Sequence, residues 1–127
     1  MEKLKILIVE DEILIRAHLS DIVESCGCAV VGETPRGEKA VSLARDLKPD
    51  LVLMDIRLKG KMDGIEAAKI INAGRTVPVA FVSAYEIDEV SIDDTVPVSF
   101  FLGKPIDRYT LIPVLEHIQA PIERPGA

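Results

Sequence analysis

The sequence contains no tryptophan, and aromatic residues make up only 4% of its 127 residues. A core without large rings has to be built from Ile, Leu, Val and Ala, which suits a buried sheet covered by helices. Apolar residues reach 48% of the chain, so material for such a core is present. The length fits one domain and is enough to bury a core without disulfides or a structural metal.

Cysteine is scarce as well, and long apolar runs are missing. Cys26 and Cys28 are one residue apart, which differs from the Cys-x-x-Cys spacing of redox and zinc sites. We therefore expect free thiols in a reducing compartment. No apolar run is long enough to cross a bilayer, and the chain does not open with a signal-like segment. These absences predict a cytoplasmic protein without membrane insertion.

Positive charge is the third shortage. The 15 Lys and Arg residues are outnumbered by 21 Asp and Glu residues, which gives a net charge of −6. Nucleic acids are bound through clustered Lys and Arg, so direct nucleic-acid binding is not expected. An acidic pocket that holds a cation is compatible with this balance.

Short apolar runs alternate along the chain with stretches of helical periodicity, which predicts buried strands between helices. The predicted strands are Ile6–Val9, Ala29–Gly32, Leu51–Met54, Val79–Val82 and Phe100–Leu102. Strands that alternate with helices pair in parallel through right-handed crossovers. The expected fold is therefore α/β, a doubly wound five-stranded parallel sheet with helices on both faces.

Helix boundaries are predicted from apolar stripes and from capping residues. They are Glu12–Cys26 followed by Gly27, an N-cap at Thr34 with Pro35 as the first helical residue, Asp63 to Gly74, and an N-cap at Asp107. Pro113 lies inside the last of these helices, where it removes a hydrogen bond and should bend the helix.

Polar residues follow the predicted strands at the edge where doubly wound sheets bind ligands. Glu10 and Asp11 follow the first strand, Asp55 the third and Ser83 the fourth, while Lys104 follows the fifth. Singly, each has an ordinary explanation, such as a helix cap, a turn residue or a solvated side chain. Their joint placement at four strand ends favours a common site.

The chemistry of such a site follows from charge. Two carboxylates at about 4 Å repel by roughly 4 kcal/mol at an effective dielectric of 20, so either some are protonated or a cation lies among them. Carboxylate oxygens suit Mg²⁺ (or Mn²⁺). The Asp55 carboxylate would be a nucleophile toward a phosphoryl group, Lys104 a positive charge for one phosphoryl oxygen, and Ser83 a hydrogen-bond donor to another.

Five segments of the chain resemble the receiver domains of bacterial and archaeal response regulators in two-component systems, in the same order and spacing. They are Lys5–Glu12 (KILIVEDE), Asp50–Leu58 (DLVLMDIRL), Met62–Glu66 (MDGIE), Val79–Ala84 (VAFVSA) and Leu102–Pro105 (LGKP). The resemblance extends from Leu4 to about Ile118. It implies the flavodoxin-like strand order 2-1-3-4-5.

The resemblance also implies a role for each site residue. Asp55 matches the phosphorylated aspartate, Glu10 and Asp11 the acids that position Mg²⁺, the backbone carbonyl of Arg57 a further metal ligand, Ser83 and Lys104 the contacts of the phosphoryl group, and Phe101 the switch aromatic. The implied donor is a sensor histidine kinase or a histidine phosphotransfer protein, and an unknown protein is the downstream target. Such a domain is not a classical enzyme, but it catalyses its own phosphorylation and dephosphorylation.

Some features depart from the family pattern. Glu10 stands where Asp is commoner, and the acidic segment from Tyr85 to Pro97 has little apolar periodicity. We therefore expect the fourth helix of the family to be short or irregular here. The receiver is expected over residues 1–120, with a disordered tail over 121–127.

Three other functions are weighed against this interpretation. A flavodoxin-like cofactor binder needs a phosphate loop after the first strand, where Glu10–Asp11–Glu12 would repel phosphate. A phosphatase needs an acid beside its nucleophile, whereas Arg57 lies two positions after Asp55. A pseudo-receiver that only binds partners stays open. Lys59 and Lys61 either steer an anionic donor or are solvated loop charges.

Overall fold

The computed structural model describes residues 3–84 and 94–119. Its centre is a five-stranded parallel sheet in the order β2-β1-β3-β4-β5. The strands are β1 (Lys5–Val9), β2 (Ala29–Thr34), β3 (Leu51–Asp55), β4 (Val79–Ser83) and β5 (Ser99–Gly103). Both the doubly wound α/β fold and the strand order 2-1-3-4-5 are confirmed, and each strand is longer than its apolar run predicts.

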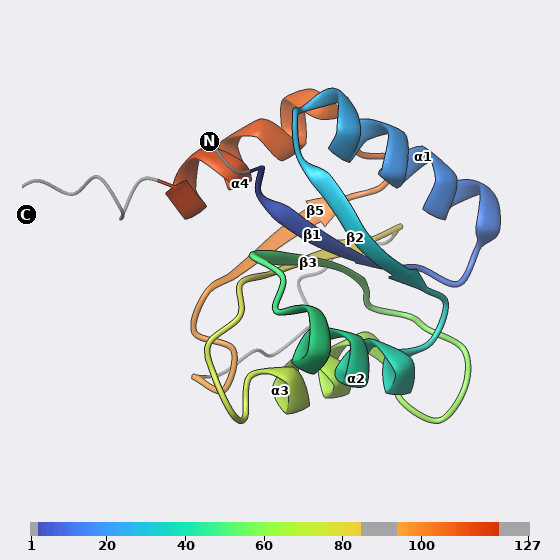
Figure 1. The fold of residues 1–127 in the computed structure, drawn as a ribbon. Helices are drawn as coiled ribbons and strands as arrows, with labels where there is room; N and C mark the ends of the chain where they lie inside the picture. The colour runs from blue at the N-terminus through green and yellow to red at the C-terminus, as the bar shows by residue number, and fades with distance from the viewer. Residues whose placement is uncertain (1–2, 85–93, 120–127) are drawn as a thin grey trace, which may run out of the picture.

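Four helices of the described residues cover the sheet in two layers. They are α1 (Ile13–Ser25), α2 (Gly37–Leu47), α3 (Gly64–Ile71) and α4 (Arg108–Gln119). Figure 1 shows α1 and α4 on one face and α2 and α3 on the other. The sheet is therefore buried on both faces, which is why its strands read as continuous apolar runs.

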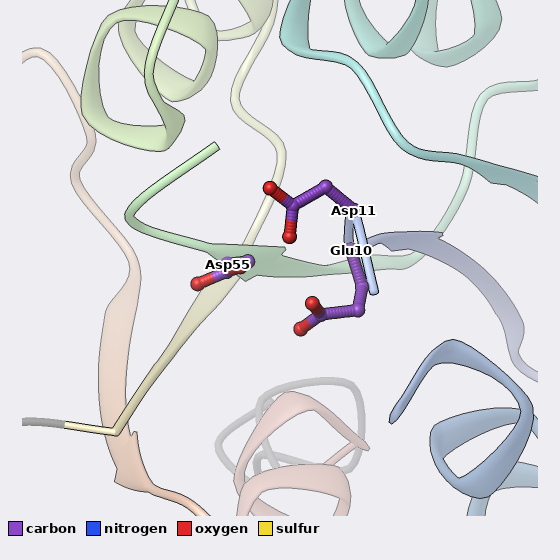
Figure 2. Close-up of side chains that lie close together, drawn as sticks. All are labelled: Glu10, Asp11 and Asp55. Atoms are coloured by element: carbon purple, nitrogen blue, oxygen red, sulfur yellow. The ribbon is translucent and has the colours of Figure 1, made fainter. Parts of the chain in front are cut away.

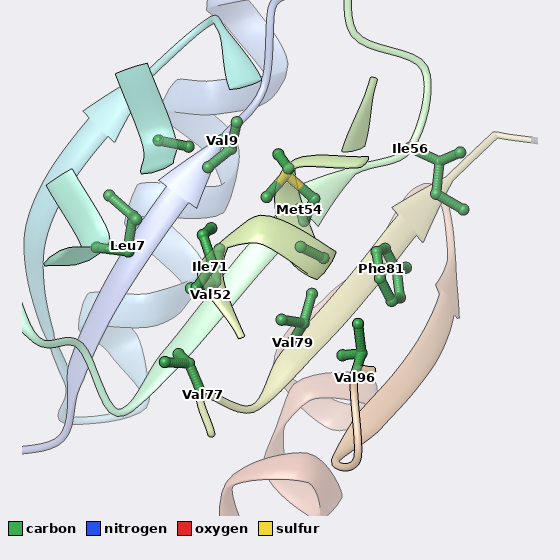
Figure 3. Packing of buried hydrophobic residues seen from close by; sticks show 14 of the residues in the cluster. Leu7, Val9, Val52, Met54, Ile56, Ile71, Val77, Val79, Phe81 and Val96 are labelled. Carbon is green, nitrogen blue, oxygen red and sulfur yellow. The ribbon is translucent and has the colours of Figure 1, made fainter. Parts of the chain in front are cut away.

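The core consists of two clusters, one on each face of the sheet. Leu7, Val52 and Phe81 belong to the cluster under α2 and α3, part of which is drawn in Figure 3. Ile6 and Leu53 belong to the cluster under α1 and α4. Because successive strand residues point to opposite faces, each central strand contributes to both clusters. The two clusters hold the central strands in place, and with them the residues at the carboxyl edge of the sheet.

The predicted start of the second helix is wrong. Thr34 is the last residue of β2 and pairs with Val9, and its carbonyl accepts a hydrogen bond from the Glu10 N–H at 3.0 Å. The helix begins at Gly37, and its N-cap, Arg36, makes no side-chain capping bond. Thr34 still uses its hydroxyl locally, since Oγ1 accepts from the Arg36 N–H at 3.3 Å. Pairing with β1 thus extends the strand through a residue that resembles a cap.

The end of the third helix also differs from the prediction, while its start is confirmed. Asp63 and Glu66 form a capping box at the N-terminus of α3. The helix ends at Ile71 rather than at Gly74, because Asn72 is its C-cap. The Asn72 side chain donates to the Ala68 carbonyl at 3.0 Å and accepts from the Val77 N–H at 2.8 Å.

The remaining helix ends follow the sequence signals. Gly27 adopts a φ of +82° after α1, the left-handed conformation that glycine favours. Asp107 Oδ1 accepts a hydrogen bond from the Thr110 N–H at 3.0 Å at the start of α4. This helix continues through Pro113 to Gln119.

Two predicted features lie partly or wholly outside the described residues. The segment expected to form a short or irregular helix includes residues 85–93, which are not described, and residues 94–98 form turns and bends. The predicted tail falls outside the described ranges as well. In the part of the chain that the structure covers, no helix is long and apolar enough to cross a membrane.

Candidate functional site

Three carboxylates from separate segments meet at the carboxyl edge of the sheet. Glu10 and Asp11 follow β1, and Asp55 ends the neighbouring strand β3. One oxygen of each carboxylate lies within 4.8 Å of the others, and Figure 2 shows the three side chains together. The parallel pairing of β1 with β3 produces this arrangement because it brings the carboxyl ends of both strands to one edge.

Backbone amides hold one oxygen of each carboxylate. Glu10 is fully buried, and its Oε2 accepts from the Glu12 N–H at 3.0 Å. Asp11 Oδ2 accepts from the Lys59 N–H at 3.2 Å, and Asp55 Oδ1 accepts from the Arg57 N–H at 3.3 Å. The amides orient the acids but do not neutralise their charges.

Lys104 supplies a positive charge inside this cluster. Its Nζ lies 2.9 Å from Glu10 Oε1 and 3.5 Å from Asp55 Oδ2, and its side chain is 15% exposed. The Lys104 N–H donates to the Ser83 carbonyl at 2.8 Å, which ties the loop after β5 to the end of β4. Ser83 itself is buried, one residue beyond the Val82 that pairs with Asp55.

Burial and charge act against each other in this site. Burial raises the pKa of Glu10 and that of Asp55 above their ordinary values. Burial alone would lower the pKa of Lys104, but hydrogen bonding and attraction to Glu10 and Asp55 outweigh it and raise the pKa. When all groups are ionised, three carboxylates and one ammonium leave two uncompensated negative charges in a poorly solvated place.

The donor set fits a divalent cation. All three groups offer hard oxygen atoms, which Mg²⁺ and Mn²⁺ accept readily. Glu10 Oε1 is buried, and the polar partner that the described residues give it is Lys104 Nζ, at 2.9 Å. A cation among these acids would also balance the excess negative charge, so the chemistry of the cluster fits a metal site.

The other predicted site residues lie nearby in sequence and in the sheet. Arg57 is exposed and follows Asp55 by two positions. The metal contact from its backbone carbonyl stays a prediction. Phe101 on β5 pairs with Phe81 on β4, and their rings stack with centroids 5.4 Å apart. The Phe101 side chain nevertheless remains 43% exposed.

Comparison with known proteins decides the family. A family model described as the response regulator receiver domain matches residues 6–116. The chain belongs to the response regulator receiver family. The site described above thus lies in the receiver domain of a two-component system, and the match takes in every predicted site residue.

Individual relatives agree with this membership. The receiver is 38% identical to the transcriptional regulatory protein PdtaR of Mycobacterium tuberculosis over 113 residues, which is 88% of this chain and 55% of PdtaR. The structure of this receiver matches the signal receiver domain of a modulated diguanylate cyclase from Desulfovibrio desulfuricans with a TM-score of 0.81 and 34% identity. The match covers 97% of this chain and 100% of the other chain. A CheY chain in a CheX–CheY–BeF3–Mg²⁺ complex from Borrelia burgdorferi gives a TM-score of 0.82 at 26% identity, with 92% and 90% covered. This chain thus spans about half of the length of PdtaR, as its coverage of 55% shows.

Two residues that shape the receiver site have no counterpart in the sequence prediction. Arg16 on α1 donates from Nη1 to the Glu10 carbonyl at 2.7 Å, and its Nε lies 3.7 Å from Glu33 Oε1. Gly64, the first residue of α3, lies so close to β3 that an added Cβ would overlap the carbonyl oxygen of Asp55. Arg16 could have been predicted as a contact of this site, because it is a cation in the first turns of the helix that follows the acidic end of β1.

Proposed function

We propose that this receiver accepts a phosphoryl group on Asp55 from a phosphohistidine of a sensor histidine kinase or a histidine phosphotransfer protein. The proposal rests above all on one observation, the meeting of the Asp55, Glu10 and Asp11 carboxylates, with the Lys104 ammonium beside Asp55 and Glu10. Family membership supports it, because receiver domains act with kinases and downstream targets. The cytoplasmic location expected from the sequence is part of the same proposal.

The transfer needs a carboxylate nucleophile that is held in place. An Asp55 oxygen forms the new bond to phosphorus while the bond between phosphorus and the donor imidazole breaks, and the imidazole leaves with its electron pair. The Arg57 N–H holds Oδ1 of Asp55 at 3.3 Å and thereby fixes the carboxylate for attack. Hydrolysis of the acyl phosphate later restores Asp55.

Charge neutralisation comes from Lys104 and from a bound cation. Glu10, Asp11, Asp55 and the carbonyl of Arg57 would hold Mg²⁺ or Mn²⁺, which reduces the repulsion between the carboxylates and an incoming phosphoryl group. Lys104 lies within 3.5 Å of Asp55 and is placed to pair with a phosphoryl oxygen once the group is attached. In the CheY relative, Mg²⁺ is present in the complex, which supports the choice of metal.

Signalling would follow from new contacts of the phosphoryl group. Ser83, on the strand next to Asp55, would donate its hydroxyl to the phosphoryl group and move toward it. Phe101 would then turn inward from its half-exposed position beside Phe81. A contact made in only one of two states shifts the population toward that state.

The downstream output is proposed more coarsely. PdtaR is a transcriptional regulatory protein, and the matched segment covers 55% of it, so a transcriptional output is not carried over to this receiver. A CheY chain occurs in a complex with the protein CheX. We propose a protein as the direct target of this receiver, with no direct contact to nucleic acid.

The test is phosphorylation by acetyl phosphate with and without Mg²⁺, followed by intact mass. We expect one Mg²⁺-dependent adduct that is lost in base, and none on the Asp55→Asn variant. A phosphorylated histidine phosphotransfer protein serves as a second donor, so that a strict preference for a protein donor is detected. If neither donor gave an adduct, the pseudo-receiver alternative would be supported. An adduct that persists in Asp55→Asn would place the acceptor at another residue.

A further inference from the structure

A hollow lies at the opposite edge of the sheet from Asp55. It is a cavity of about 390 Å³ between the C-terminal ends of α2 and α3. Lys48, which precedes β3, and Val77, which precedes β4, both line it, so it lies at the amino ends of the strands. Asp55 ends its strand at the other edge, so the hollow is separate from the phosphoacceptor site.

The floor of this hollow is apolar. Val41 on α2 and Ile70 and Ile71 on α3 line it, together with Val77. Ile71 and Val77 belong to the packed core cluster and are labelled in Figure 3. Ile70, in contrast, is 47% exposed, which leaves apolar surface open to a ligand.

Three cationic side chains line the hollow together with the apolar residues, and among the described residues no acidic side chain lines it. They are Arg45, Lys48 and Arg75. Arg75 uses one N–H group on the Pro49 carbonyl at 3.2 Å, which leaves other guanidinium donors available. Arg45 pairs with Asp46 at 3.0 Å on an exposed surface, and Lys48 forms no ion pair with any residue in the described ranges.

Favourable interaction with the helix dipole is the ordinary explanation of cations at helix C-termini. It explains the charges of Arg45 and Lys48 at the end of α2. It does not explain why a hollow with apolar lining residues lies between α2 and α3 beside these charges. The volume lies in the range of small-molecule sites, roughly 300–1,000 Å³. A concave site of this size fits a small molecule better than the surface of a folded protein.

We propose that the hollow between α2 and α3 binds a small organic anion, with a carboxylate against Lys48 and Arg75 and an aliphatic tail on the Ile70–Val77 floor. Charge complementarity selects the sign of the head group, and the apolar floor selects a tail over a bare inorganic ion. The site is independent of the chemistry at Asp55, although α3 connects the two regions, since Gly64 at its other end packs on the Asp55 backbone.

The test uses octanoate below its micelle concentration, titrated into the protein and followed by calorimetry and by amide NMR shifts. We expect saturable binding at one site, with the largest shifts at Val41, Ile70 and Val77. Acetate lacks the tail and 1-octanol lacks the charge, so both should bind at least about tenfold more weakly. Equal binding of 1-octanol, or no saturation with octanoate, would overturn the proposal.

Variants make the test specific to this site. The double variant Lys48→Gln/Arg75→Gln should bind octanoate about fivefold more weakly, since partly exposed charges contribute a few tenths of a kcal/mol to 1 kcal/mol each. Lys39→Gln, on an exposed position of α2 that does not line the hollow, is the matched control and should bind normally. Equal loss in both variants would mean a general charge effect and would refute the site.

The outcome is separable from that of the proposed function. Asp55→Asn should bind octanoate as the wild type does, whatever the phosphorylation assay shows. Thermal unfolding of every variant verifies that the fold is kept, so weaker binding is not mistaken for unfolding. Loss of octanoate binding in Asp55→Asn would contradict a site at the opposite edge of the sheet.

Discussion

At the scale of single residues, the acidic cluster is a place where function opposes stability. Asp55 is 5% exposed and Glu10 is fully buried, and burial raises the pKa of both. Ionising either group in this environment costs free energy, which Lys104 offsets only in part. Strained electrostatics of this kind are common at functional sites.

Replacing Asp55 with Asn should therefore stabilise the metal-free protein. Removing one buried negative charge is expected to raise the free energy of unfolding by about 1 kcal/mol at pH 7. Mg²⁺ should raise the unfolding temperature of the wild type, because it binds the folded state, and raise that of Asp55→Asn much less. Thermal unfolding with EDTA and with Mg²⁺ measures both effects.

Asp46→Asn is the matched control for this prediction. Asp46 is an exposed aspartate of α2 that forms an ion pair with Arg45, away from the cluster. Its replacement should change stability little and leave the response to Mg²⁺ intact. If Asp55→Asn destabilised the metal-free protein, the carboxylate would be held favourably and the electrostatic argument would fail.

At the scale of elements, the third helix is placed by close contact with the strand that carries Asp55. The Gly64 N–H donates to the Ile56 carbonyl at 2.9 Å, and a Cβ at Gly64 would also lie 2.9 Å from Met54 Cγ. Glycine is therefore needed here for a close approach of two backbones. The capping box of Asp63 and Glu66 then starts the helix at this position.

Gly64→Ala should displace α3 or the Asp55 peptide. Overpacking of this kind costs about 1–3 kcal/mol of unfolding free energy, and we expect slower phosphorylation by acetyl phosphate as well. Gly74→Ala is the control, because a Cβ at Gly74 meets nothing within 4 Å. Urea unfolding of both variants decides the matter, and an equal effect of the two substitutions would contradict the close-contact argument.

At the scale of the whole molecule, the buried acids link stability to pH. The pKa of Glu10 lies above its ordinary 4.5 and that of Asp55 above its ordinary 3.8, so between these values and the raised ones the folded protein binds more protons than the unfolded chain. The unfolding free energy then falls as pH rises. The pKa of Lys104 is raised above 10.5, so its contribution is lost only at strongly alkaline pH and does not affect this window.

The predicted pH effect is a difference between two proteins. In EDTA, the wild type should lose stability relative to the double variant Glu10→Gln/Asp55→Asn as pH rises from about 4 toward neutrality. Below that range both acids are protonated in the folded and the unfolded state, so the difference should level off. Urea unfolding at a series of pH values measures it, and a difference that grows in favour of the wild type would show that the acids are stabilised as anions.

Part of this molecule could be derived from the sequence because it depends on local pattern. Buried strands need continuous apolar runs, and helices need caps such as Asp63 and Asp107, so the alternation of elements is written along the chain. The meeting of Glu10, Asp11 and Asp55 followed from one further rule, that parallel strands end at the same edge.

Other features were decided only by the tertiary structure. Thr34 has the residue type of a cap, yet pairing with β1 makes it the end of a strand, and Asn72 ends α3 because its side chain reaches Val77 across a turn. The contact of Gly64 with Asp55 and that of Arg16 with the Glu10 carbonyl depend on how closely whole elements approach one another. Such distances arise from packing between segments that are separate in sequence, which no local pattern encodes.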